Sequence, residues 1–152
     1  MQLTRYTDYS LRVLIYLMLR DGSPATISEI ASYYDISRHH LVKVVHNLGI
    51  LGLVDTMRGK GGGLRLANGT REKRLGGVVR SIEANLRLID CGSITHDNLC
   101  TVLPVCDLPR VFNRALHRFF EELDRYRLED IITEASSPFE LPGLVQRGGS
   151  SR

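Results

Sequence analysis

Apolar positions recur at helical spacing in several stretches of the chain. Within residues 8–20 they form one stripe made of Leu11, Leu14, Ile15, Met18 and Leu19. This spacing predicts an amphipathic helix that Thr7 or Asp8 caps and that the turn at residues 21–24 ends.

Two shorter helices are predicted next. Thr26 and Glu29 form a capping box, because a threonine is followed three residues later by glutamate. That helix ends near Asp35, and Ser37 is placed to cap the following helix, which runs to about Leu48. Two short helices joined by a tight turn are typical of a helix-turn-helix.

A β-hairpin is predicted directly after this helix pair. Two short strands are expected, at residues 53–57 and 64–67, and they flank the glycine-rich segment 58–63. A phosphate-binding loop is excluded, because Gly61 stands where Ser or Thr is needed and Val54 where the first glycine is needed. The hairpin is therefore interpreted as the wing of a winged helix-turn-helix.

The second half of the chain has a different character. A fourth helix is expected over residues 75–84 and a long one over 107–126, whose apolar stripe must pack on the head or on a second copy. The second copy is favoured, because the small head already has its own core. A short helix is expected over residues 128–134. Nine of the last 17 residues are Gly, Ser or Pro, which predicts a disordered tail.

These elements predict a mainly α fold, with an N-terminal winged helix-turn-helix, a two-stranded β wing and a long C-terminal dimerisation helix. Four parts of the chain are expected: a winged-helix DNA-binding domain (1–89), a cysteine-containing segment (90–106), a dimerisation helix with a short terminal helix (107–135) and a disordered tail (136–152).

Charge is distributed unevenly along the 152 residues, whose net charge is +3. Residues 1–89 carry +6 and residues 90–152 carry −3, and segment 36–80 holds nine basic and two acidic residues. A basic front half and an acidic back half suggest a nucleic-acid-binding head joined to a sensing or assembly half. A solvated charged surface is the alternative that charge alone leaves open.

The longest uncharged apolar run, residues 13–19, is shorter than the roughly 20 residues that span a bilayer. No signal peptide is recognisable, so a cytoplasmic protein without membrane association is expected. Cytosolic thiols stay reduced, so the three cysteines indicate metal or redox use rather than disulfides.

The predicted second helix of the helix-turn-helix presents hydrogen-bonding side chains, as a major-groove recognition helix requires. They are Ser37, Arg38, His39, His40, Lys43 and Asn47. Arg or Lys reads guanine, and Asn reads adenine. The adjacent histidines make a poor metal pair and have ordinary surface positions as an alternative. Arg58 and Lys60 at the wing tip suit a narrow minor groove, with a solvated turn as the alternative.

Three cysteines lie close together, at Cys91, Cys100 and Cys106. Structural zinc prefers closer pairs, and these wider gaps suit an iron–sulfur cluster. A cluster takes about four protein ligands. His96, or a residue from elsewhere in the fold or from a partner subunit, is left to supply the fourth.

These features together resemble the NsrR/IscR family of winged-helix iron–sulfur regulators, and within it the nitric-oxide-sensing NsrR branch. Besides the three cysteines, the resemblance rests on four segments of this sequence: Leu3-Thr4-x-Tyr6-Thr7-Asp8-Tyr9, Ile36-Ser37-Arg38-x-His40-Leu41-Val42-Lys43-Val44, Arg58-Gly59-Lys60-x-Gly62-Gly63-x-Arg65-Leu66 and Val78-Val79-Arg80-x-Ile82-Glu83. It covers residues 1–133.

The resemblance implies a homodimer on double-stranded DNA with a palindromic operator. It implies a [4Fe-4S] or [2Fe-2S] cluster on Cys91, Cys100 and Cys106, with Asp8 of the other subunit as fourth ligand. Pro109 stands where the IscR branch has a ligating histidine, which argues against that branch. The implied function is a repressor that releases its operator when nitric oxide nitrosylates the cluster.

Three alternatives remain beside this reading. The first is a regulator of the same fold that senses iron–sulfur or redox status. The second is a small iron–sulfur electron carrier, which would not need the basic head. The third is a DNA-binding protein with structural zinc. No catalytic constellation is visible, so an enzyme is not expected, and Asp107 is expected to cap the long helix.

Overall fold

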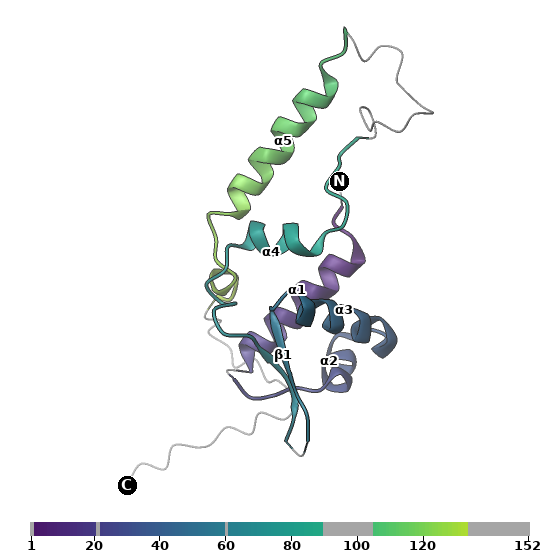
Figure 1. Cartoon of the computed structure of the whole chain (residues 1–152), viewed down its shortest axis with the longest axis vertical. Coiled ribbons are helices and arrows are strands. Elements are labelled where there is room, and N and C mark those ends of the chain that lie inside the picture. The colour runs from purple at the N-terminus through teal and green to yellow at the C-terminus, as the bar shows by residue number, and fades with distance from the viewer. Residues whose placement is uncertain (1, 21, 60, 90–104, 134–152) are drawn as a thin grey trace.

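The computed structural model describes residues 2–20, 22–59, 61–89 and 105–133. Its elements, in chain order, are α1 (Arg5–Leu19), α2 (Ile27–Tyr34), α3 (Arg38–Ile50), β1 (Val54–Met57), β2 (Gly63–Leu66), α4 (Leu75–Ile82), α5 (Leu108–Leu123) and a 3₁₀ turn (Glu129–Ile131). Helices α1 to α4 and the hairpin form a head, from which α5 extends along the long axis (Figure 1). The predicted mainly helical, winged helix-turn-helix fold is confirmed.

The head is built around one hydrophobic core. Leu14 and Tyr16 of α1 and Leu41 and Leu48 of α3 are fully buried in it, as is Leu128 from the segment after α5. Full burial of such a side chain stabilises the fold by roughly 1.5–3 kcal/mol. The apolar stripes of the amphipathic helices therefore hold the head together.

Helix α1 begins three residues earlier than predicted. Its N-cap is Thr4, whose hydroxyl accepts from the Thr7 amide, so the expected caps Thr7 and Asp8 are already helical. Glu83, at the end of α4, accepts hydrogen bonds from the Thr4 amide and hydroxyl and from the Thr7 hydroxyl, the last at 2.6 Å. This buried carboxylate fixes the start of α1 from 79 residues away.

The helix-turn-helix closely follows its prediction. The capping box is present: the Thr26 hydroxyl accepts from the Glu29 amide and the Thr26 amide donates to the Glu29 carboxylate. Asp35 ends α2 in the left-handed conformation. Helix α3 begins directly after Ser37, but the Ser37 side chain makes no capping hydrogen bond to a described residue.

The wing is an antiparallel pair of strands, as predicted. Val54 faces Leu66 and Met57 faces Gly63 across the pair. Ala25, just before α2, exchanges two backbone hydrogen bonds with Leu64. The base of the wing is therefore bound to the helix-turn-helix as well as to its own strand partner.

Helix α5 meets the head through α4, in its own chain. Arg80 of α4 donates to Asp124 at 2.6 Å, and its guanidinium lies over the Phe120 ring. Sequence reasoning favoured a second copy as the packing partner, and the structure shows that the carboxyl-terminal turn of α5 packs on the head.

The residues after α5 return to the head. Helix α5 ends at Leu123, before the predicted residue 126, because the Tyr126 carbonyl accepts from the Leu75 amide and the Leu128 amide donates to the Lys73 carbonyl. The helix predicted from Leu128 is a three-residue 3₁₀ turn. Helix α4 ends at residue 82, and the predicted disordered tail lies outside the described residues. No helix among the described residues is long and apolar enough to cross a membrane.

Candidate nucleic-acid interface

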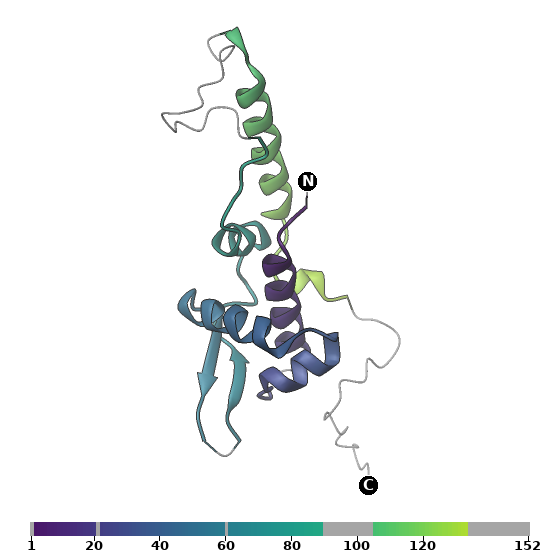
Figure 2. The same cartoon turned by 90° about the vertical axis from the view of Figure 1, so that its right-hand side faces the viewer.

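Helix α3 and the wing lie next to each other on the head. In two perpendicular views the hairpin projects from the end of the molecule opposite to the amino end of α5 (Figures 1 and 2). A helix-turn-helix with a neighbouring wing can contact two adjacent grooves of a duplex at once. The arrangement therefore leaves one end of the molecule available for DNA.

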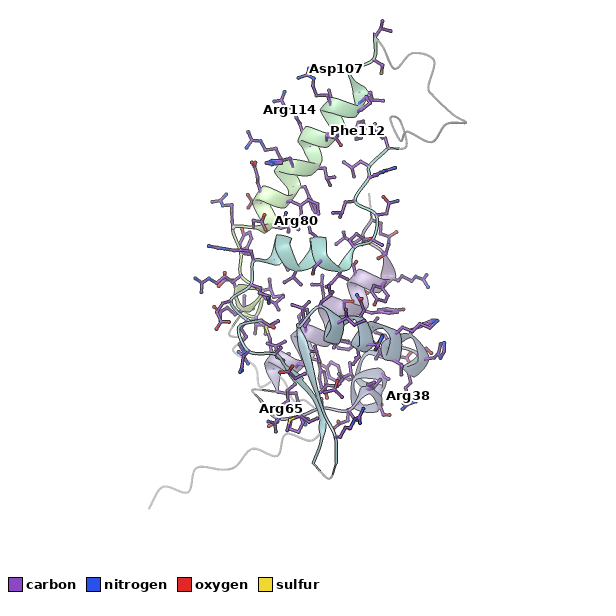
Figure 3. All side chains as sticks on the ribbon, in the orientation of Figure 1. Arg38, Arg65, Arg80, Asp107, Phe112 and Arg114 are labelled. Atoms are coloured by element: carbon purple, nitrogen blue, oxygen red, sulfur yellow. The ribbon has the colours of Figure 1, made fainter. Side chains whose placement is uncertain are left out.

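Helix α3 has one apolar and one polar face. The buried face consists of Leu41, Val44, Val45 and Leu48. Six of the eight side chains predicted to contact DNA belong to α3 and its N-cap. Five of these are exposed, namely Ser37, Arg38, His39, His40 and Lys43, and Asn47 is half-buried. Arg38 projects outward from the head (Figure 3). Helix α3 contains no acidic residue, so nothing within it repels a phosphate backbone.

Helix α1 braces one edge of α3. The Tyr6 hydroxyl donates to the Lys43 carbonyl at 3.3 Å, and the Tyr9 ring stacks on His40 with centroids 6.5 Å apart. Burial raises the pKa of Tyr6, and its hydrogen bond with Asn47 partly opposes that shift. Sequence reasoning did not assign Tyr6, because its role depends on how α1 and α3 pack.

The wing tip is kept thin by its glycines. The Gly62 amide donates to the Gly59 carbonyl, and a Cβ on Gly62 would lie 2.3 Å from the Met57 carbonyl oxygen. Gly59 has a φ of 95°, which favours glycine. Arg58 is exposed at this tip, while Lys60 lies outside the described residues. A thin cationic tip of this shape suits a narrow groove.

The proposed metal ligands are placed only in part. Cys106 is half-buried and lies two residues before α5. Asp8 is exposed on α1, where its carboxylate pairs with Arg12 at 3.0 Å. Cys91, Cys100 and His96 lie outside the described residues. Among the described residues no three His, Cys, Asp or Glu side chains gather into a group that could hold a metal ion.

The two described ligand candidates lie in different parts of the molecule. Asp107, the neighbour of Cys106, marks the end of α5 farthest from the head, whereas Asp8 belongs to the first turns of α1 (Figure 3). Asp107 occupies the N-cap position of α5. Its carboxylate accepts from Arg110 and accepts no capping hydrogen bond from a backbone amide of the described residues. That pairing lowers the pKa of Asp107.

Comparisons with known proteins agree with this architecture. The model of the Rrf2 family, described as iron-dependent transcriptional regulators, matches residues 3–134. The chain is 46% identical over 133 residues to the HTH-type transcriptional regulator NsrR of Bacillus subtilis, covering 87% of this chain and 90% of that protein. It is 45% identical over 138 residues to NsrR of Geobacillus kaustophilus, covering 90% and 93%.

Solved structures show the same fold. The cysteine regulator CymR of B. subtilis superposes with a TM-score of 0.66 at 25% identity, covering 86% of this chain and 95% of that one. The T. potens IscR structure has a TM-score of 0.65 at 23% identity, covering 86% and 85%. The sequence, the winged helix-turn-helix and these comparisons show that the chain belongs to the Rrf2 family of transcriptional regulators, and that it is a DNA-binding regulator rather than an enzyme.

Proposed function

We propose that this chain is a repressor that binds a palindromic operator as a homodimer and releases it when nitric oxide reacts with a bound iron–sulfur cluster. The identity to regulators named NsrR supports this function. The structural observation that carries its DNA-binding part is the exposed, acid-free face of α3 beside a thin cationic wing.

Each half of the operator is read by one head. Arg38 and Lys43 donate to guanine edges in the major groove, and Asn47 pairs with adenine. Ser37, His39 and His40 supply further hydrogen bonds along the same face. Arg58 and Lys60 of the wing neutralise phosphates and enter the minor groove. Two heads of a dimer then occupy half-sites about one helical turn apart, roughly 34–36 Å.

The dimer forms through the amino-terminal half of α5. Leu108 and Val111 are exposed there, at 44% and 53% of their maximum. Near the carboxyl-terminal end of α5, Phe120 is buried against α4. A second α5 crossing the exposed half removes these apolar side chains from water and leaves both heads free.

The cluster is held by Cys91, Cys100 and Cys106, with Asp8 of the partner subunit as fourth ligand. Thiolates and a carboxylate are a suitable donor set for iron, and when bound the cluster supplies iron that reacts with nitric oxide. Asp8 and Cys106 lie in different parts of one chain, which favours ligation between subunits. Asp8 directly follows Thr7, whose hydroxyl donates to Glu83. A ligand bond to Asp8 would therefore also restrain the position of α1 in the head. In this structure the Asp8 carboxylate pairs with Arg12 on its own helix.

The first experiment measures iron, sulfide and zinc in anaerobically purified protein, together with operator affinity before and after nitric oxide. The proposal expects iron and sulfide, and a loss of affinity with nitric oxide. Asp8→Ala should weaken cluster retention or uncouple it from DNA release, while Glu72→Ala, at another exposed carboxylate of the head, changes neither. Zinc alone, or affinity unaffected by nitric oxide, contradicts the sensor.

The wing is tested through salt dependence. Replacing Arg58 with Ala should lower affinity for many sequences and reduce the slope of log K against log salt by about one. The control is Arg125→Ala, another exposed arginine, which lies just after α5. An unchanged slope for the Arg58 variant contradicts a wing contact with phosphate.

A further inference from the structure

Val42 is an apolar side chain on the polar face of α3. It is 40% exposed, and within α3 the other large exposed apolar residue is Ile50, at the last turn. Single exposed apolar residues are common on protein surfaces, so exposure alone indicates nothing. The position of Val42 on the helix, in contrast, indicates which kind of group it can contact.

Residues three and four apart share a face of a helix. Val42 follows Arg38 and His39 by four and three residues and precedes His46 by four, and all three of these side chains are exposed. The fourth such neighbour, Val45, belongs to the buried stripe, so Val42 stands where the polar face of α3 borders that stripe. Val42 therefore lies in the second turn, within the surface that Arg38 and His39 present to the bases.

The chemistry of the major groove leaves a valine one favourable partner. Base edges there present hydrogen-bond donors and acceptors, and the thymine C5-methyl is the apolar group among them. A valine placed against an amino or carbonyl group removes water from it and returns no hydrogen bond, which is unfavourable. Against a thymine methyl the same side chain removes apolar surface from water on both partners.

We propose that Val42 selects thymine in each operator half-site through contact with its C5-methyl group. The inference rests on the proposed function, in which α3 lies in the major groove. Val42 then supplies sequence preference without a hydrogen bond, between the guanine-reading side chains Arg38 and Lys43.

The size of the effect follows from one methyl group. Burial of one such group corresponds to about a fourfold change in affinity. Replacing the thymine by deoxyuridine deletes that methyl and leaves every hydrogen-bonding group of the base in place. Val42→Ala removes the valine methyl groups, which are the protein's part of the contact. The substitution leaves α3 intact, because alanine has a higher helix propensity than valine.

The experiment combines the protein substitution with the base substitution, so that each protein is measured on each duplex. The operator is a duplex that the full-length, anaerobically purified protein selects from a random-sequence pool, and each symmetric pair of thymines is replaced in turn by deoxyuridine. At one pair the wild type should lose about fourfold in affinity per half-site. Val42→Ala should show no loss at that pair. Ile50→Ala, the matched exposed apolar residue, should keep the wild-type pattern.

Three results overturn the inference. They are a selected half-site without thymine, a wild type insensitive to every deoxyuridine pair, and a Val42→Ala variant with the same losses as the wild type. In each of these the protein still selects a duplex, so the proposed DNA recognition stands without Val42. A protein that selects no sequence overturns both.

Discussion

Two neighbouring glycines of α4 offer a matched test of how tightly α5 is joined to the head. Gly76 is buried, and a Cβ added to it would lie 2.3 Å from Oδ1 of Asp124 and 3.0 Å from the Phe120 carbonyl oxygen. Gly77 is exposed, and a Cβ there would meet nothing within 4 Å. The same substitution by alanine therefore tests packing at one position and helix propensity at the other.

The two substitutions are expected to change the free energy of unfolding in opposite directions. Alanine in place of a helical glycine stabilises by up to about 1 kcal/mol, so Gly77→Ala should raise the free energy of unfolding by roughly 0.5–1 kcal/mol. At Gly76 the same gain is opposed by overpacking, which destabilises by about 1–3 kcal/mol. Asp124 cannot move away freely, because Arg80 binds its other oxygen at 2.6 Å. Gly76→Ala should therefore be less stable than Gly77→Ala by about 1–3 kcal/mol.

The measurement is urea unfolding of both variants and the wild type by far-ultraviolet circular dichroism. All three are compared at one protein concentration, because dimerisation would make apparent stability depend on it. A shift of the midpoint without a change of slope reports stability alone. Equal stability of the two alanine variants would refute the close contact between α4 and α5.

Three further predictions concern single contacts. Thr26→Ala should lower the free energy of unfolding by about 1 kcal/mol in thermal or urea unfolding, because it removes the hydroxyl half of the capping box, and an unchanged stability contradicts that contribution. Gly62→Ala should weaken operator binding in fluorescence anisotropy while the circular dichroism of the head stays unchanged, because a Cβ there meets the Met57 carbonyl oxygen at 2.3 Å; wild-type affinity would show that the tip tolerates a side chain. Burial alone would raise the pKa of Glu83. The hydrogen bonds from Thr7 and Thr4 lower this pKa by more than burial raises it, so it lies below the ordinary 4.5. The stability from Glu83 is therefore fully present above pH 4.5 and is lost as the pH falls through the folded pKa. Glu83→Gln should flatten this acid loss in urea midpoints measured against pH, and a variant that keeps the full acid loss contradicts it.

Local patterns predicted most of the head correctly. The capping box at Thr26 and the buried stripe of α3 both depend on residues within four positions of each other, which is the range that helix periodicity covers. The wing was recognisable for the same reason, because its strands are adjacent in the chain. The exposed side chains of α3 followed from the stripe on its opposite face.

Contacts between distant segments decided what was missed. Thr4 rather than Thr7 or Asp8 caps α1, because Glu83 binds Thr4 from another helix. Tyr6 supports α3 through a packing arrangement that no local pattern encodes. Asp107 and Ser37 stand at N-cap positions, yet one pairs with Arg110 and the other makes no capping bond to a described residue. Residue type alone does not decide between such partners.

The return of the chain after α5 has a consequence for how this protein can be altered. Leu128 is fully buried in the head core, and the Leu128 amide binds the Lys73 carbonyl. In the sequence, residues 84–123 are thus an insertion between two segments that are both anchored in the head. A force on this insertion reaches the head at two points, through Glu83 on one side and Asp124 on the other. Exchanging the insertion between relatives should preserve the head only when both anchors are retained.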